Sequence, residues 1–261
     1  MAYAFLTATR DGGIERLTLN RPDMRNAFNA EMIAEITDWA RGVSAAAGEL
    51  RAVVLAGEGN AFCAGGDAAW MAQTVGYTED ENLEDARALS GMFRAIDTLP
   101  LPVIGRVQGA AVGGGAGLAA VCDIVVAAQD ATFGFTEVKL GLVPAVISSF
   151  VLNKIGQSAA RELFLTGARF TAARAREIGL VHAVVPASEL DAAVAGYLAE
   201  IATGGPEAIA TAKSLIRTIA ALAPGDAAAF GTKAIAARRT SAEGQEGLRA
   251  FLGKRLPRWS R

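Results

Sequence analysis

The sequence predicts an α/β fold whose strands are covered by helices on both sides. The order strand, glycine-rich loop, helix occurs at least twice along the chain. The segments ELRAVVLAGEG (49–59) and LPLPVIGRVQG (99–109) are largely apolar, as strands buried on both faces usually are. With 261 residues, 52% of them hydrophobic, the chain is long enough to bury a sizeable core.

The first elements are a hairpin and a helix. Two strands are predicted at 2–7 and 14–20, and the DGG sequence at 11–13 between them is a favourable hairpin turn. Asn29 then follows the turn-rich segment RPDMRNAFN and can cap a helix over 30–47. The apolar residues that support this helix recur at helical spacing, namely Met32, Ile33, Ile36 and Trp39.

Strands and helices alternate through the rest of the chain. The further predicted strands are 49–59, 99–109, 122–129 and a short one within 131–141. The further predicted helices are 79–98, a short one ending at Val121, then 158–167, 171–178, 189–203 and an alanine-rich series after 206. Gly204-Gly205-Pro206 is the best candidate boundary, which predicts a core at 1–200 and a helical region at 201–261.

Composition excludes several classes of function. The net charge is −2, with acidic and basic residues interspersed, which argues against a nucleic-acid partner. The uncharged stretches fall short of the roughly 20 apolar residues that a membrane span needs. The start, MAYAFLTATR, does not resemble a signal peptide, so we expect a cytoplasmic protein. Two cysteines and one histidine predict neither a disulfide framework nor a metal site.

The most unusual local feature is the glycine triplet at 113–115 within VQGAAVGGGAGLAAVCDI. It does not follow the G-x-G-x-x-G pattern, and Asp123 comes too early for the acidic residue of a dinucleotide site. Glycines at the start of a helix can instead leave backbone N–H groups open to a negatively charged oxygen. A second glycine loop, AFCAGGD at 61–67, could supply another donor to an oxyanion hole. Tight packing of helix against sheet is the alternative, and spacing alone favours it slightly.

Taken together, these motifs resemble the crotonase superfamily, the enoyl-CoA hydratases and isomerases. The matching segments are AFCAGGD, VQGAAVGGG, the CDI that follows it, FGFTEVKLGLVP, RPDMRNAFN and EGLRAFLGKR. They cover nearly the whole chain. The resemblance implies a crotonase-like ββα spiral core with two nearly perpendicular sheets and a C-terminal helical oligomerisation region. It also implies a homotrimer or a hexamer.

The resemblance places the chemistry on three residues. The backbone N–H groups of Gly66 and Gly114 would bind the thioester oxygen of an acyl-CoA and stabilise the enolate. Glu137, in FTEVKLG, would be the acid/base carboxylate. By itself Glu137 would more often be a surface strand residue, although its apolar flanks permit a raised pKa that suits proton transfer.

Contacts with the substrate are also implied by the resemblance. The residues expected to bind substrate are Arg25, Ala27, Ala64, Asp67, Trp70, Phe251 and Lys254. Arg25 and Lys254 would lie near the CoA phosphates and the nucleotide, but both could equally be ordinary surface residues. Asp67 could instead be a loop cap. No metal or redox cofactor is implied, because CoA is part of the substrate.

One position departs from the family pattern. Hydratases with two carboxylates carry a second Glu where this chain has Gly117. Glu137 could perform both proton steps of hydration, it could shuttle a proton between carbons as an isomerase does, or Asp67 or Glu79 could serve as a second carboxylate. An inert acyl-CoA binder is a further alternative.

The expected activity is reversible hydration of a 2-enoyl-CoA. The segments at 66–71, 76–86 and 137–156 are similar to the bacterial methylglutaconyl-CoA and isohexenylglutaconyl-CoA hydratases of leucine and acyclic-terpene breakdown. This similarity favours 3-methylglutaconyl-CoA or a related branched acyl-CoA as the substrate. A basic partner for its second carboxylate is expected, but the sequence does not identify one.

Overall fold

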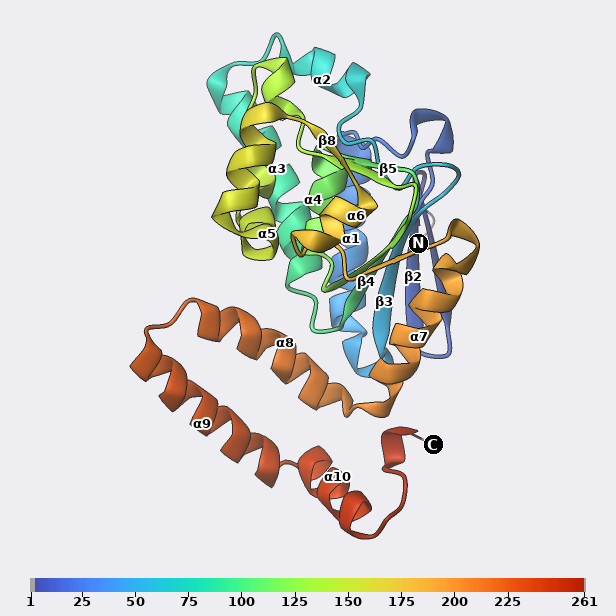
Figure 1. Cartoon of the computed structure of the whole chain (residues 1–261), viewed down its shortest axis with the longest axis vertical. Helices are drawn as coiled ribbons and strands as arrows, with labels where there is room; N and C mark the ends of the chain where they lie inside the picture. The colour runs from blue at the N-terminus through green and yellow to red at the C-terminus, as the bar shows by residue number, and fades with distance from the viewer. Residues whose placement is uncertain (1–2, 261) are drawn as a thin grey trace.

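A six-stranded sheet organises the computed structural model, which describes residues 3–260 (Figure 1). The strand order is β1-β2-β3-β4-β6-β9, and every neighbouring pair is parallel except β1 and β2. The strands are β1 (Leu6–Asp11), β2 (Ile14–Leu19), β3 (Ala52–Gly57), β4 (Val103–Val107), β6 (Ile124–Ala128) and β9 (Ala183–Val185).

A second, three-stranded sheet has the order β5-β7-β8. Its strands are β5 (Ala110–Val112), β7 (Thr132–Gly134) and β8 (Arg169–Thr171). The chain passes from one sheet to the other at Gln108 and Gly109, between β4 and β5. The glycine triplet follows β5 directly, so the second sheet carries the beginning of the next helix.

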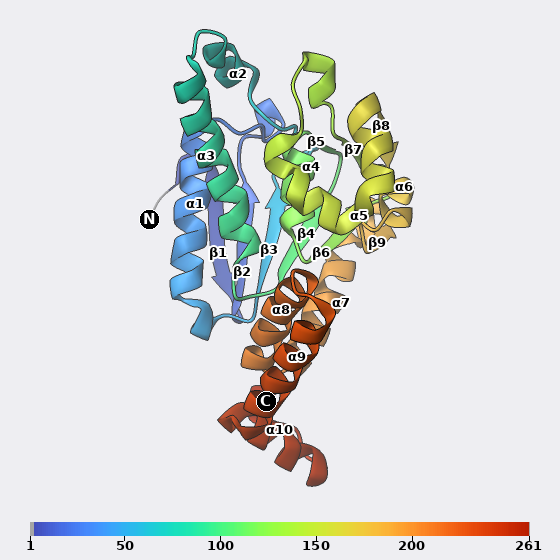
Figure 2. The same cartoon turned by 90° about the vertical axis from the view of Figure 1, so that its left-hand side faces the viewer.

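Helices cover both faces of the large sheet. The helices within residues 3–260 are α1 (Ala30–Ala45), α2 (Ala68–Thr74), α3 (Glu79–Asp97), α4 (Gly114–Val121), α5 (Ala145–Thr166), α6 (Ala172–Glu177), α7 (Leu190–Thr203), α8 (Pro206–Ala220), α9 (Pro224–Thr240) and α10 (Ala242–Leu252). In Figure 2, α1 and α3 lie in front of the sheet and α7 lies behind it. The main core is on the side of α1, α3, α4 and α5, and a smaller core lies under α7.

The ends of these helices follow from local sequence. The Asn29 side chain accepts a hydrogen bond from the Met32 N–H and caps α1 as predicted. Thr78 and Glu81 form a reciprocal capping box at the start of α3. Both caps fix helices that deliver aromatic side chains to the main core, Trp39 from α1 and Phe93 from α3.

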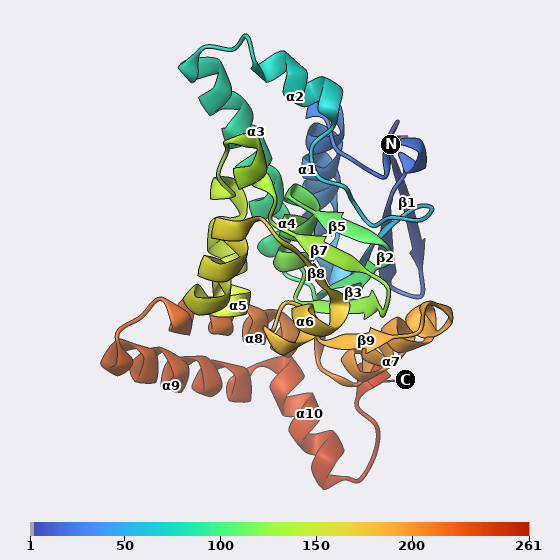
Figure 3. The same ribbon diagram turned by 45° about the horizontal axis from the view of Figure 1, so that its top comes forward.

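Helices α8, α9 and α10 form an arm that extends from the core (Figures 1 and 3). Lys213 on α8 joins the arm to the core, because its Nζ donates to Asp123 Oδ2 at 2.7 Å and to the Leu101 carbonyl at 3.0 Å. Within the arm, Glu243 accepts from the Glu207 and Ala208 N–H groups and pairs with Arg238. The three helices are therefore fastened to one another by polar contacts.

Several elements differ from the sequence predictions. Strand β1 lies at 6–11 instead of 2–7, because the turn consists of Gly12 and Gly13 alone and Asp11 pairs with Ile14. Helix α5 is interrupted at Gly156, where φ is 69° and ψ is 170°. The part after Gly156 matches the predicted helix at 158–167, and the part before it, from Ala145, was not predicted. Helix α2 was not predicted.

The short strand predicted within 131–141 is β7, and the segment from Glu137 to Leu140 in the same stretch forms a 3-10 helix. The predicted division into 1–200 and 201–261 stays a prediction of domain organisation. In the structure α8 begins at Pro206, directly after the Gly204-Gly205 break.

Candidate active site

The first glycine loop is held in place by backbone pairing with Phe28. The Phe28 N–H donates to the Gly65 carbonyl at 2.9 Å, and the Asp67 N–H donates to the Phe28 carbonyl at 3.0 Å. Gly66 lies between these two bonds and forms a parallel bridge with Phe28. Among residues 3–260 the Gly66 N–H has no backbone acceptor, so it remains available to a ligand.

The second glycine loop meets the first one. Gly113 has φ 56° and ψ −125°, a conformation that glycine adopts easily, and its N–H donates to the Gly134 carbonyl at 2.8 Å. Gly114 then begins α4, so its N–H belongs to the first turn and has no partner within the helix. A Cβ on Gly65 would lie 3.5 Å from the Gly114 nitrogen. The two loops that carry the predicted donors are thus in contact.

The Glu137 carboxylate lies beside the second glycine loop. A Cβ on Gly113 would lie 3.6 Å from Glu137 Oε1, which puts this carboxylate beside the start of α4. Its other oxygen, Oε2, is buried without a hydrogen-bond partner in the described part of the chain. Burial raises the pKa of Glu137 above its ordinary value of 4.5. A partly desolvated carboxyl group next to two open N–H groups is suited to acid/base chemistry at an acyl carbon.

A second carboxylate has no room at Gly117. A Cβ at this position would overlap Ile147 Cγ2 and would lie 3.1 Å from Phe93 Cζ. Gly117 is therefore a packing position between α4 and α5, and replacement of its hydrogen by any side chain requires Ile147 or α5 to shift.

Neither Asp67 nor Glu79 takes the place of the second carboxylate that is missing at Gly117. Asp67 caps α2 by accepting from the Ala69 N–H at 2.7 Å, and it pairs with Arg21 at 2.8 Å. The hydrogen bond from Arg21 lowers the pKa of Asp67, so this group stays ionised and engaged. Glu79 is exposed at the beginning of α3.

The predicted substrate residues near the N-terminal turn come together. The Ala64 N–H donates to the Arg25 carbonyl at 2.9 Å, which joins the turn to the first glycine loop. Arg25 is exposed and Ala27 is buried. Trp70 is buried against the loop: a Cβ on Gly66 would lie 3.3 Å from its ring. The Trp70 Nε1–H donates to Asp85 on α3 at 3.2 Å.

Phe251 and Lys254 are elsewhere. Phe251 is on α10 and is 82% exposed, and Lys254 follows the same helix. In Figures 1 and 2, α10 and α2 lie at opposite ends of the molecule. One chain therefore does not bring these two residues to Trp70. Phe251 and Lys254 can contribute to an active site only if that site is in another copy of the chain.

Sequence reasoning missed Asn26 and Arg21. Asn26 is fully buried, donates to the Glu58 and Ala61 carbonyls at 2.8 Å, and accepts from the Arg21 N–H. Arg21 Nη1 donates to the Ala27 carbonyl and Nη2 to Asp67. An Asn directly before the apolar pair at 27–28 was a usable signal, since a buried polar side chain must find partners.

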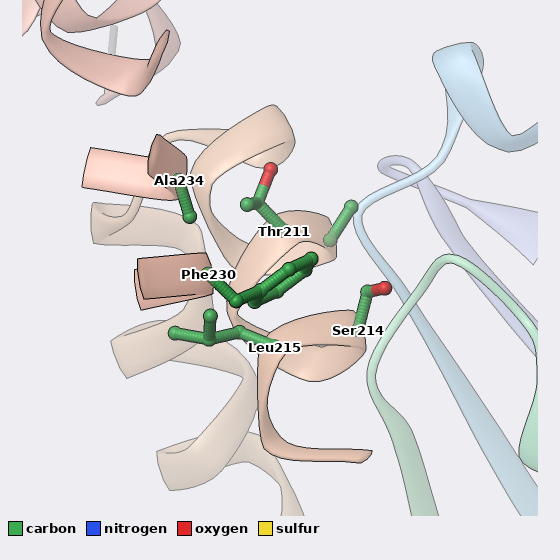
Figure 4. A pocket seen from close by; sticks show the side chains of 6 residues that line it. Thr211, Ser214, Leu215, Phe230 and Ala234 are labelled. Atoms are coloured by element: carbon green, nitrogen blue, oxygen red, sulfur yellow. The ribbon is translucent and has the colours of Figure 1, made fainter. Parts of the chain in front are cut away.

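A cavity of about 310 Å³ lies between α8 and α9 (Figure 4). It is lined by Ala210, Thr211, Ser214, Leu215, Phe230 and Ala234. Because it lies in the arm, it is separate from the glycine loops. In residues 3–260 no three His, Cys, Asp or Glu side chains are grouped to hold a metal ion, and no described helix has the length and apolarity to span a bilayer.

Comparison with known proteins gives one consistent result. Residues 9–261 match the family described as enoyl-CoA hydratase/isomerase. A solved enoyl-CoA hydratase from Shewanella pealeana is 36% identical, with a TM-score of 0.94 over 98% of this chain and 96% of its own. The solved Pseudomonas aeruginosa AtuE is 35% identical, with a TM-score of 0.95 over 98% of this chain and all of its own. The enoyl-CoA hydratase ACTT6 of Alternaria alternata is 36% identical over 80% of this chain and 68% of its own.

Proposed function

Because the chain belongs to the enoyl-CoA hydratase/isomerase family and has the crotonase fold, we propose that it catalyses the reversible hydration of a 2-enoyl-CoA with Glu137 as its acid/base carboxylate. The observation that carries the proposal is the position of Glu137. Its carboxylate lies beside the glycine triplet, with one buried oxygen that no described group satisfies.

The N–H groups of Gly66 and Gly114 act on the thioester oxygen. When water adds at C3, the electrons of the C2=C3 double bond move toward C2 and the thioester oxygen, and two fixed donors stabilise the negative charge on this oxygen. Removal of one such donor typically costs about 2.7–4 kcal/mol of transition-state stabilisation. Gly66 is fixed by the bridge to Phe28 and Gly114 by the start of α4, so neither donor has to reorganise during the reaction.

Glu137 moves the proton. In hydration the ionised carboxylate takes a proton from water as the water oxygen bonds to C3, and the enolate forms. The protonated carboxyl then gives this proton to C2, and the thioester carbonyl is restored. The raised pKa of Glu137 makes its carboxylate a stronger base than an exposed glutamate, which eases removal of the proton from water.

The acyl group we propose is branched, with 3-methylglutaconyl-CoA as the first candidate. The support for this substrate is the similarity of the segments at 66–71, 76–86 and 137–156 to hydratases of such substrates. Trp70, whose ring packs edge-on against Phe28, lies beside Gly66 and adds apolar character next to the first glycine loop.

Isomerisation of a 3-enoyl-CoA to the 2-enoyl-CoA is a second candidate. The closed position at Gly117 favours it, because transfer of one proton between two carbons needs only one carboxylate.

A trimer or hexamer is also part of the proposal. Its support is the number of exposed apolar side chains on the arm, namely Ile216, Ile219, Leu222, Phe230, Ile235, Leu248, Phe251 and Leu252. Apolar surface concentrated in this way is typical of subunit contacts. The cytoplasmic location stays a prediction.

The first test follows the absorbance of the conjugated enoyl thioester with crotonyl-CoA and with 3-methylglutaconyl-CoA. We expect loss of conjugation with the branched substrate and its abolition in Glu137→Gln, with Glu79→Gln as an exposed matched control. A gain of conjugation from a 3-enoyl-CoA, without hydration of a 2-enoyl-CoA, would show that the protein is an isomerase and not a hydratase. Silence in both assays together with acyl-CoA binding by calorimetry would leave an inert binder.

A further inference from the structure

We propose that Phe28 is the positioning residue that sets the separation of the two oxyanion-binding N–H groups. This inference rests on the proposed function, since it concerns the same pair of donors. Phe28 carries no group that could react with an acyl-CoA, and its side chain is 1% exposed. Its effect on the reaction must therefore be indirect.

The backbone of Phe28 fixes the first donor. Its N–H and its carbonyl bind the residues on either side of Gly66, at 2.9 Å to Gly65 and 3.0 Å from Asp67. A bridge with two bonds determines both the position and the orientation of the peptide between them. The direction of the Gly66 N–H thus depends on where the Phe28 backbone lies.

The ring of Phe28 supports the second donor. A Cβ on Gly114 would overlap the tip of this ring and would lie 3.1 Å and 3.2 Å from two further ring carbons. The tip of the ring is therefore in contact with the residue whose N–H opens α4. At the next residue of the triplet, the Cys63 carbonyl leaves no space for a side chain on Gly115. The start of α4 is thus held between the first loop and Phe28.

The ring itself cannot move aside. Trp70 packs edge-on against it with a centroid distance of 6.3 Å, and Phe93 does so at 6.4 Å. Phe93 also contacts Gly117, one turn further along α4. Phe28 thus contacts both donor loops, with its backbone on one and its ring on the other.

This arrangement makes the length of the Phe28 side chain a determinant of the oxyanion hole. Donors must lie about 2.7–3.1 Å from the developing oxyanion, and a misplacement of about 1 Å can cost 100-fold in rate. A shorter side chain would let the start of α4 sink toward the core. A longer one would push it outward, because the ring tip already contacts Gly114.

The test compares Phe28→Leu, which shortens the side chain, with Phe28→Tyr, which adds a hydroxyl at the ring tip. We expect kcat to fall roughly 10- to 100-fold in both variants while KM changes less than threefold. Phe170→Leu is the matched control, because Phe170 is buried against Phe133 and Phe135 in the second sheet. We expect Phe170→Leu to lower the free energy of unfolding about as much as Phe28→Leu does and to leave kcat unchanged.

A second measurement isolates the oxyanion hole from general loss of stability. Acetoacetyl-CoA binds as its enolate where such a hole exists, and the enolate absorbs in the near ultraviolet. We expect the bound enolate fraction to fall in the Phe28 variants and to be unchanged in Phe170→Leu. If Phe28→Leu does not fold, Phe28→Met takes its place.

The outcomes separate the two proposals. An active wild type whose Phe28→Leu and Phe28→Tyr variants keep both kcat and the enolate signal would overturn the role of Phe28 alone. A wild type that neither hydrates nor isomerises any enoyl-CoA and binds no enolate would overturn the proposed function, and the role of Phe28 with it.

Discussion

Glu137 combines two properties that a surface carboxylate lacks. Its Oε2 atom has no hydrogen-bond partner among residues 3–260, and burial raises its pKa. A buried acceptor without a partner costs free energy, so this oxygen gains stabilisation when a bound ligand donates a hydrogen bond to it.

The pH dependence of the rate follows from this environment. As the base in hydration, Glu137 must be ionised in the free enzyme. We expect kcat/KM to fall as the pH decreases through its raised pKa, so that the acidic limb lies above the ordinary value of 4.5. A pH–rate profile measures it. An acidic limb at or below 4.5 would contradict the assignment.

The same pKa predicts an effect on stability. Because the folded-state pKa is raised, the folded protein binds the proton more tightly than the unfolded chain, and the ionised group weakens folding at higher pH. Glu137→Gln should therefore unfold at a higher temperature than the wild type at pH 7. The gain should vanish below pH 4.5, where Glu137 is protonated in both states. Thermal unfolding at several pH values checks this, and Glu79→Gln should show no such trend.

Asn26 is expected to matter more for stability than any other side chain of the N-terminal turn. Asn26→Ala leaves two carbonyls and one N–H without their partner, at about 1–3 kcal/mol each. We expect the free energy of unfolding, measured with urea, to fall by about 3 kcal/mol or more. Asn82→Ala removes exposed hydrogen bonds on α3 and should change it by less than about 0.5 kcal/mol. Equal effects in the two variants would refute this account.

At the residue scale the sequence predicted the residues of the motifs but not the residues that hold these motifs in position. The glycines and Glu137 stand in short segments with characteristic spacing. Asn26 and Phe28 act through partners about 30 to 90 positions away, which no local pattern shows. Phe251 and Lys254 matched a motif as well, yet one chain places them far from α2.

At the scale of elements, α4 depends on the close approach of its neighbours. Its first turn lies on Phe28 and the Cys63 carbonyl, and its second turn lies on α5 and Phe93. Small residues let all of these surfaces meet. The price is that few substitutions fit between α4 and α5.

Packing at Gly117 can be tested by matched Gly→Ala substitutions. Gly117→Ala should lower the free energy of unfolding by about 1–3 kcal/mol, because the methyl group overlaps Ile147. Ile147→Leu, which removes Cγ2 at nearly constant volume, should cost less than about 1.5 kcal/mol. The double variant should lose less than the sum of the two.

Gly91→Ala provides the control. Gly91 lies within α3 with open space around its Cβ position, so alanine there should stabilise the protein by up to about 1 kcal/mol. Denaturant titrations of all four variants give the comparison. Strict additivity at 117 and 147 would show that the contact carries no strain.

Long amphipathic elements were predicted well, and elements with mixed signals were not. Helices α1 and α3 follow the expected 30–47 and 79–98 closely, because caps and apolar spacing agree there. In α5 the part after Gly156 follows the predicted 158–167, because Gly156 leaves the helical conformation (φ 69°, ψ 170°). The part from Ala145 to Gly156 was not predicted as a helix, and α5 begins directly after Pro144.

At the scale of the whole molecule, the arm formed by α8, α9 and α10 has apolar side chains that do not pack into the core. None of the residues of α8 and α9, all of which are described, is buried, although α8 has a well-defined apolar face. The sequence predicted helices here because alanine-rich segments favour them. Local sequence does not show what covers them, because the described residues of the same chain leave α8 and α9 without a buried side chain.

Assembly through the arm can be tested with one charge. Ile216 is 73% exposed on α8, and Ile216→Glu should reduce the mass in sedimentation from that of the wild-type oligomer to that of a monomer. Val75→Glu is the control, since Val75 is 88% exposed next to α2, at the other end of the molecule. A wild type that sediments as a monomer would refute assembly, and an Ile216→Glu oligomer would refute this surface.

The contact between α5 and Gly117 ties the chemistry of the molecule to its evolutionary history. A second carboxylate at this position requires at least two substitutions, one that adds the acid and one that clears Ile147. Either change alone reduces stability, through overlap in the first case and through a cavity in the second. We therefore expect the two substitutions to be tolerated one at a time only in a background that carries spare stability.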